Sequence, residues 1–190
     1  MNWLVEIFKN ISPYAVIAGG LWVLYNYWRG RAFEKKLLLD VRTLSKVLAE
    51  LRILFVEVQL TNAGKGKLEA RRVGPNDYVY KDEFEQLKYS CSLQIRRINV
   101  TKLVGETYLD WYKCSALESV ADIPTEINLL DDYVVPDENN EIVFWMEPGD
   151  IVQLSAPLVL QAGHYLLKIS FYGTNPNEDF WSRLVYVQLE

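Results

Sequence analysis

The sequence predicts a mainly β protein in which a single N-terminal transmembrane α-helix is followed by one antiparallel β-sandwich. The helix is indicated by nineteen consecutive uncharged residues between Lys9 and Arg29. The sandwich is indicated by about eight short segments beyond residue 36 that alternate apolar and polar residues and are separated by turn residues. A chain of 190 residues suits one domain plus an appendage. We therefore expect the tail and helix within residues 1–31 and the sandwich within residues 32–190.

The uncharged stretch has the dimensions of a membrane span. Nineteen helical residues at about 1.5 Å each extend roughly 28 Å, close to a hydrocarbon core of about 30 Å. Every residue from Tyr14 to Leu24 is apolar or glycine, so the helix has no polar stripe. Three rings that suit a membrane interface follow: Tyr25, Tyr27 and Trp28. We expect a permanent span over about residues 11–28. A buried helix of a soluble protein and a cleaved signal are the alternatives, and the basic cluster after the apolar run disfavours the signal.

The flanking charges predict the orientation of this helix. Four cations flank its C-terminal end, namely Arg29, Arg31, Lys35 and Lys36, whereas only Lys9, with Glu6 nearby, flanks the other. Because Lys and Arg prefer the cytoplasmic side, the C-terminal domain is expected in the cytoplasm, with the four cations close to anionic lipid. In that compartment Cys91 and Cys114 are expected to stay reduced, as buried core thiols.

The first strands are predicted from alternation. Residues 36–43 alternate as in a strand, but Leu44, Val47, Leu48 and Leu51 recur at helical spacing, so we expect a strand followed by a turn or short helix. The next segment places Leu54, Val56, Val58 and Leu60 on one face. Asn62-Ala-Gly-Lys-Gly then predicts a tight turn before a strand from Leu68. Further strands are expected within residues 88–98, 107–114, 141–146, 150–160, 164–173 and 180–190.

Tyr165 indicates which kind of sandwich the chain forms. It follows the Gly163 turn at the start of the penultimate strand. A tyrosine in that place resembles the tyrosine corner of immunoglobulin-like domains, in which the hydroxyl ties the turn back to the backbone. Leu167 stands where the immunoglobulin cysteine would be, so the inter-sheet disulfide is missing. An ordinary strand tyrosine is the alternative. The fold expected is an immunoglobulin-like β-sandwich.

Five segments carry a family resemblance: YWRGRAFEKK, LFVEVQLTNAGKGKLE, MEPGDIVQL, GHYLLKISFYG and FWSRLVYVQL. Together they resemble small bacterial single-pass membrane proteins with one immunoglobulin-like sandwich facing the cytoplasm or the periplasm. The resemblance covers most of the chain except residues 70–135. It implies this architecture and a place in the bacterial inner membrane, and it implies no activity.

Residues that carry chemistry are scarce. The chain contains none of the patterns G-x-S-x-G, P-loop, dinucleotide-binding glycines or metal-spaced His/Cys, and His164 is its one histidine. We therefore expect no enzyme, no catalytic residue, no cofactor and no metal centre. The weak cation candidate is an acidic stretch whose oxygens suit calcium: Asp131, Asp132, Asp137, Glu138 and Glu141. Its spacing matches no calcium loop, and a solvated acidic loop is the alternative.

Charge and aromatic residues suggest the partners. Residues 29–102 hold 16 Lys and Arg against 9 Asp and Glu, whereas residues 103–190 hold 3 against 15. Arg71-Arg72 and Arg96-Arg97 are interpreted as an extension of the basic flank or as unrelated solvated positions. The net charge of −8 beyond residue 36 disfavours nucleic acid.

The function expected is a membrane-anchored, non-enzymatic protein-interaction module. Its partners would be membrane lipid and a protein, as an accessory or scaffolding subunit of a membrane complex or as a homo-oligomer. Candidate partner contacts are aromatic, with core packing as the alternative for at least half of them: Trp111, Tyr112, Trp145 and Trp181. A ligand or cation sensor that uses the acidic stretch, and an unrecognised hydrolase, are the other hypotheses.

Overall fold

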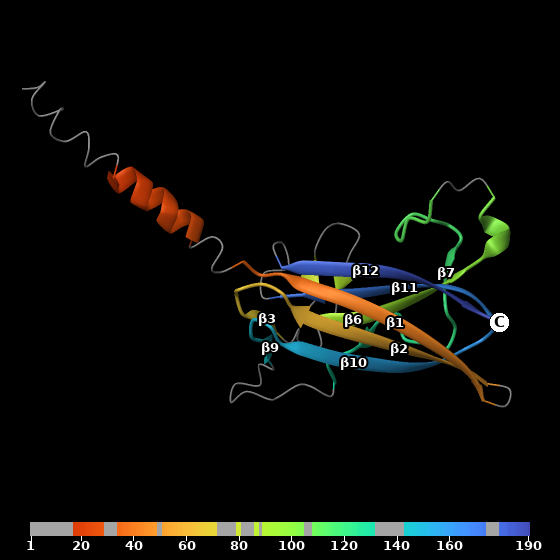
Figure 1. Cartoon of the computed structure of the whole chain (residues 1–190). Helices are drawn as coiled ribbons and strands as arrows, with labels where there is room; N and C mark the ends of the chain where they lie inside the picture. Colours follow the sequence, from red (N-terminus) through yellow and green to blue (C-terminus); the bar gives the residue numbers. More distant parts are fainter. Residues whose placement is uncertain are drawn as a thin grey trace, which may run out of the picture.

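The computed structural model describes residues 17–28, 34–48, 51–71, 79–80, 86–87, 89–104, 108–131, 143–173 and 179–190 (Figure 1). Residues 17–28 are helical, and their side chains are exposed. Among the described residues, no helix has the length and apolar character that a membrane crossing requires. Residues 11–16 of the predicted span, together with Arg29 and Arg31, lie outside the described residues. The expected interface rings are exposed: Tyr25 by 49%, Tyr27 by 58% and Trp28 by 71%.

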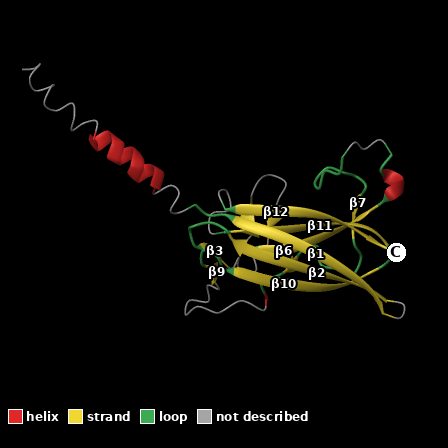
Figure 2. Ribbon diagram, in the orientation of Figure 1, coloured by secondary structure: helices red, strands yellow, loops and turns green. Residues whose placement is uncertain are grey.

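Two antiparallel sheets contain most of the strands (Figure 2). The first has the order β1-β2-β10, with β1 at Leu37–Leu48, β2 at Leu51–Asn62 and β10 at Ile151–Leu160. The second has the order β12-β11-β6-β7, with β12 at Phe180–Leu189, β11 at Gly163–Tyr172, β6 at Cys91–Ile98 and β7 at Leu117–Ser119. A short strand, β8 (Ile127–Asn128), also pairs with β6. The mainly β, antiparallel prediction is confirmed.

The remaining elements are short. β3 (Leu68–Arg71) pairs with β9 (Val143–Met146), and β4 (Val79–Tyr80) pairs with β5 (Gln86–Leu87). One turn of 3-10 helix, Val100–Lys102, follows β6. The Asn99 side chain begins that turn by accepting a hydrogen bond from the Thr101 N–H.

The two main sheets share one hydrophobic core. Alternate residues of β2 point into it, and Leu54, Val56 and Leu60 are fully buried. Leu167 and Phe171 of β11 belong to the same cluster from the second sheet. Burial of one such side chain contributes about 1.5 to 3 kcal/mol. The period-2 alternation in the sequence therefore packs the sheets face to face.

Two local predictions are wrong. Leu44 to Leu48 do not form a turn or short helix, because β1 continues and pairs Leu44 with Phe55 on the outer face of the sheet. Cross-strand pairing outweighs the helical spacing there. The strand expected within 107–114 is absent from its described part, residues 108–114. The Asp110 carboxylate accepts backbone hydrogen bonds from Tyr112 and Lys113, and such local bonds compete with strand pairing.

The predicted turn after β2 binds the segment that precedes β1. The Ala63 and Gly64 N–H groups donate to the Lys36 carbonyl, at 2.8 and 3.1 Å, and the Lys65 N–H donates to the Glu34 carbonyl at 2.9 Å. Lys35 forms a 2.5 Å ion pair with Asp179, which directly precedes β12. Residues 34–36, which precede the first strand, are therefore bound to the turn at residues 62–66, and we call this contact the hydrogen-bonded joint.

Two side-chain predictions are confirmed. The Tyr165 hydroxyl donates to the Gln161 carbonyl at 2.8 Å, and this bond ties the turn to the start of β11. Leu167, two residues later, is fully buried. Cys91 and Cys114 are free and buried, and burial raises the pKa of the Cys91 thiol far above its usual range.

Candidate functional site

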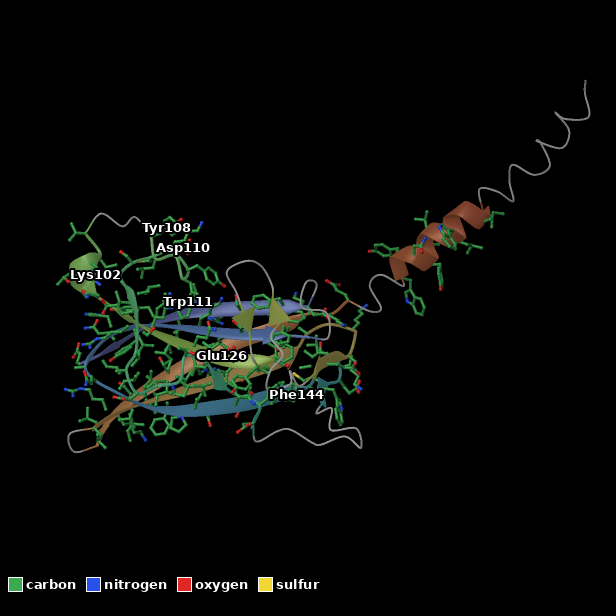
Figure 3. The ribbon with its side chains drawn as sticks, turned by 180° about the vertical axis from the view of Figure 1, so that it is seen from behind. Lys102, Tyr108, Asp110, Trp111, Glu126 and Phe144 are labelled. Atoms are coloured by element: carbon green, nitrogen blue, oxygen red, sulfur yellow. The ribbon has the colours of Figure 1, made fainter. Side chains whose placement is uncertain are left out.

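A loop over residues 108–113 lies outside the second sheet and places two aromatic residues against it. Figure 3 shows Tyr108 and Asp110 on this loop, with Trp111 closer to the sheet. The Asp110 carboxylate accepts hydrogen bonds from the N–H groups of Tyr112 (2.8 Å) and Lys113 (3.1 Å). These bonds lower the pKa of Asp110 because they favour its charged form. The Asp110 turn thereby fixes Trp111 and Tyr112.

Trp111 belongs to a second, smaller core. Its exposed fraction is 6%, and it clusters with buried apolar residues on the outer face of the sheet: Ile98, Cys114, Ala116, Leu117 and Leu166. Trp111, which was expected at a partner interface, therefore packs mainly inside the protein. Tyr112, its neighbour, has an exposed fraction of 38%.

Two cations lie against this aromatic pair. Arg96 Nη1 donates to the Trp111 carbonyl at 2.7 Å, and the guanidinium carbon lies 4.8 Å from the Trp111 ring centroid. Lys168 is only 4% exposed. Its Nζ lies 2.5 Å from the Tyr112 hydroxyl and 4.6 Å from the Tyr112 ring centroid. Both cations are stabilised by the negative faces of the rings. We call Arg96, Trp111, Tyr112 and Lys168 the basic-aromatic site.

A pocket of about 230 Å³ opens beside the basic-aromatic site. Its polar lining consists of Gln94, Arg96, Ser119 and Thr125, and its apolar and aromatic lining consists of Ile95, Trp111, Tyr112, Val120, Ile123 and Pro124. Counting only residues whose placement the structure describes, this lining contains a permanent cation and no acidic residue. Such a pocket suits an anionic group that has an apolar portion.

Carboxylates in the neighbourhood have partners of their own. Glu118 accepts hydrogen bonds from Lys102 (2.8 Å) and Asn99 (2.9 Å), which lower its pKa. Glu126 accepts from the Tyr89 N–H at 3.2 Å. Among the described residues, no carboxylate forms an ion pair with Arg96. The positive charge of the pocket is therefore not neutralised by these groups.

The outer face of the β1-β2-β10 sheet forms a second candidate surface. At the end near the β1–β2 connection, its pairing places apolar residues side by side in the rows Leu44–Phe55–Pro157 and Ile53–Val159, next to Leu51. Leu44, Leu51 and Val159 are exposed by 52%, 53% and 56%. We call these six residues the apolar face. The middle of the same sheet face is polar and lines a pocket with Asp40, Arg42, Glu57 and Gln153.

The other predicted contact residues lie apart from both surfaces. Trp145 on β9 is 49% exposed, and the Lys67 ammonium lies 5.3 Å from its ring centroid. Trp181 on β12 is partly buried against the main core, 6.0 Å from the Phe171 ring. His164 forms a 2.6 Å hydrogen bond with the Tyr186 hydroxyl.

The predicted basic surface is divided. Lys36 is exposed, and Lys35 pairs with Asp179 at the start of β12. Arg97 lies beside Gly163, which pairs with Leu189 at the end of that strand. Lys35 and Arg97 are therefore at opposite ends of a ten-residue strand and form no continuous patch. Arg72 lies outside the described residues.

The acidic stretch is described at one position. Asp131 is exposed and accepts a hydrogen bond from Asn128 at 3.3 Å. Asp132, Asp137, Glu138 and Glu141 lie outside the described residues. Where the structure describes the chain, no group of three or more His, Cys, Asp or Glu side chains is placed to hold a metal ion.

Sequence reasoning missed Lys168 as a member of the site. The available signal was a single charge within the apolar run 165–171, since lysine is almost never fully buried without a partner.

Comparison with known proteins adds no relative: no protein-family model matches the chain, and no curated protein matches it at a significant level. The class that the fold itself defines is a mainly β, antiparallel protein with an N-terminal helix.

Proposed function

We propose that this chain is a membrane-anchored, non-enzymatic protein-interaction module that serves as an accessory or scaffolding subunit of a membrane complex. Its anchor would be the uncharged stretch between Lys9 and Arg29, of which residues 17–28 are helical. The hydrogen-bonded joint at residues 34–36 supports this proposal, because it attaches the segment after the helix firmly to the domain.

The domain itself would be an immunoglobulin-like sandwich. Its sheet orders, β1-β2-β10 and β12-β11-β6-β7, support this proposal. In such domains strands A and B form one sheet together with strand E, and strands F and G form the other sheet together with strand C. Here β1, β2 and β10 take the places of A, B and E, and β6, β11 and β12 take the places of C, F and G. The hydrogen bond from Tyr165 to the Gln161 carbonyl supports it further. Domains of this architecture commonly serve recognition, but their function depends on the surface that each one presents.

The apolar face is the observation that carries the interaction proposal. Leu44, Leu51 and Val159 each expose more than half of their surface, and they adjoin Phe55 and Pro157 on one sheet face. Contiguous exposed apolar surface rimmed by polar groups marks protein interfaces. Arg42 and Glu57 provide that rim, and Lys46 pairs with Ile53 at the edge of the face, with its ammonium 5.9 Å from the Phe55 ring centroid. The occupant we propose is a different protein subunit of the same membrane complex.

Site-specific photo-crosslinking of the full chain in its native membrane tests this proposal. A benzophenone amino acid replaces Val159 on the apolar face, and the matched control replaces Ser182, which is exposed on the other sheet. We expect one stoichiometric heterologous product from position 159, lost with Leu44→Asp, and none from position 182. A product containing only a second copy of the chain would overturn the heterologous-subunit proposal. Equal products from both positions would overturn the assignment of the interface.

A further inference from the structure

We infer that the pocket beside Arg96 binds an organic carboxylate, with the guanidinium holding the acid group and the apolar lining holding its stem. The ligand class includes a small organic acid and the carboxylate at the end of a peptide. This inference is independent of the proposed function, because the pocket lies on the second sheet and the apolar face lies on the first.

Arg96 is held in place by a hydrogen bond that uses few of its donors. Among the described residues, its side chain donates to the Trp111 carbonyl at 2.7 Å, and a guanidinium has five N–H donors. The guanidinium carbon lies 4.8 Å from the Trp111 ring centroid, and this contact restricts the movement of the side chain. A planar, preorganised guanidinium matches the two oxygens of a carboxylate and loses little side-chain entropy on binding.

The charge around the pocket favours an anion. In the part of the chain that the structure describes, no Asp or Glu lines this pocket. Glu118 is bound to Lys102, and the Asp110 carboxylate is bound to two backbone N–H groups. Lys168 contacts the Tyr112 hydroxyl next to this lining.

The size and apolar part of the lining restrict the anion to one with a small stem. A volume of about 230 Å³ is below the range of about 300 to 1,000 Å³ typical of drug-sized ligands. Val120, Ile123 and Pro124 form an apolar wall on which a short aliphatic group gains burial energy. Inorganic phosphate has no such group, so we expect it to bind more weakly.

The test uses the full chain in detergent and follows tryptophan indole signals by NMR. The chain has six tryptophans, and Trp111→Phe identifies the signal of the residue in the pocket. The probes are N-acetylleucine, its uncharged amide N-acetylleucinamide, and sodium phosphate, at constant ionic strength. We expect saturable shifts of the Trp111 signal with N-acetylleucine, and binding weakened about tenfold or more for the amide, because a hydrogen bond to a charged group contributes about 1.5 to 3 kcal/mol.

Variants assign the carboxylate to Arg96. Arg96→Gln is expected to abolish saturable binding, Arg96→Lys to retain a weakened form of it, and Arg97→Gln, the same charge change at the neighbouring position, to leave it unchanged. Equal effects of the acid and the amide would overturn the inference, as would equal loss in the Arg96→Gln and Arg97→Gln variants. Phosphate binding as tight as that of N-acetylleucine would overturn the organic-acid assignment. An acetylated peptide that ends in leucine then separates the two sources: tighter binding than N-acetylleucine supports a peptide end, and weaker binding supports a small free acid.

Discussion

Asn62→Ala is expected to destabilise the domain strongly, because this side chain connects three backbone segments in the interior. Asn62 is fully buried. Its Nδ2 donates to the carbonyls of Gly66 (2.9 Å) and Met146 (3.0 Å), and its Oδ1 accepts from the Gly64 N–H (3.1 Å). At about 1 kcal/mol each, the three bonds contribute about 3 kcal/mol, and a buried group left without its partner adds about 1 to 3 kcal/mol. We expect a loss of about 4 to 6 kcal/mol, a large part of the stability of a typical domain.

Asn99→Ala is the matched control. Asn99 also makes three side-chain hydrogen bonds, two with Thr101 and one with Glu118, but it is only half-buried. Water can replace its bonds, so we expect a loss of about 1 kcal/mol. The assay is urea unfolding of the full chain in mild detergent, followed by tryptophan fluorescence. If Asn62→Ala lowers the free energy of unfolding no more than Asn99→Ala does, burial does not set the contribution of these side-chain hydrogen bonds, and the reasoning is refuted.

Three further predictions concern the interior. Gly64→Ala should weaken the hydrogen-bonded joint, because a Cβ there would lie 2.5 Å from the Lys36 nitrogen and against the Glu34 carbonyl. We expect a lower urea midpoint than in the control Gly19→Ala, whose Cβ would lie in open space. Equal midpoints for the two variants would contradict this prediction. Burial raises the pKa of Tyr172 to about 12, so its neutral form stabilises the fold below about pH 10 and this contribution is lost as the pH rises toward 12. Between these two pH values the urea midpoint should therefore fall less in Tyr172→Phe than in the unchanged chain. The same dependence of the midpoint on pH in both proteins would refute the assignment to Tyr172. Both buried cysteines should resist Ellman's reagent at pH 8 in the native protein and react after unfolding, so fast labelling of native Cys91 would show that the core opens.

Much of the fold follows from local sequence pattern. In β2 the alternation of Leu54, Val56, Val58 and Leu60 directly marks the buried face. The second half of β1 could not be predicted in this way, since Leu44 pairs with Phe55 on the outer face. An outward apolar residue breaks the expected alternation. Its meaning depends on the partner strand, which the local pattern does not identify.

The candidate site depends even more on tertiary structure. Trp111 and Tyr112 stand out in the sequence as adjacent aromatic residues. Arg96 reaches Trp111 across 15 positions, and Lys168 reaches Tyr112 across 56. No spacing rule connects such distant residues. The turn at Asp110 could not be predicted from the local pattern either, because it depends on two hydrogen bonds that the Asp110 carboxylate accepts from nearby backbone N–H groups in place of strand pairing.

The pairing of Lys168 with Leu184 indicates that the outer face of the second sheet is not arranged for stability alone. These residues are direct neighbours on β11 and β12. The lysine is 4% exposed, whereas the leucine is 47% exposed, which reverses the usual preference for burying apolar and exposing charged side chains. Burial of an ammonium group costs free energy, which the Tyr112 hydroxyl and the rings of Trp111 and Tyr112 help to offset. An apolar residue at position 168 would avoid that cost, and local departures of this kind are expected where a surface has a function. A buried charge at this position agrees with the anion binding that we infer for the adjacent Arg96 pocket.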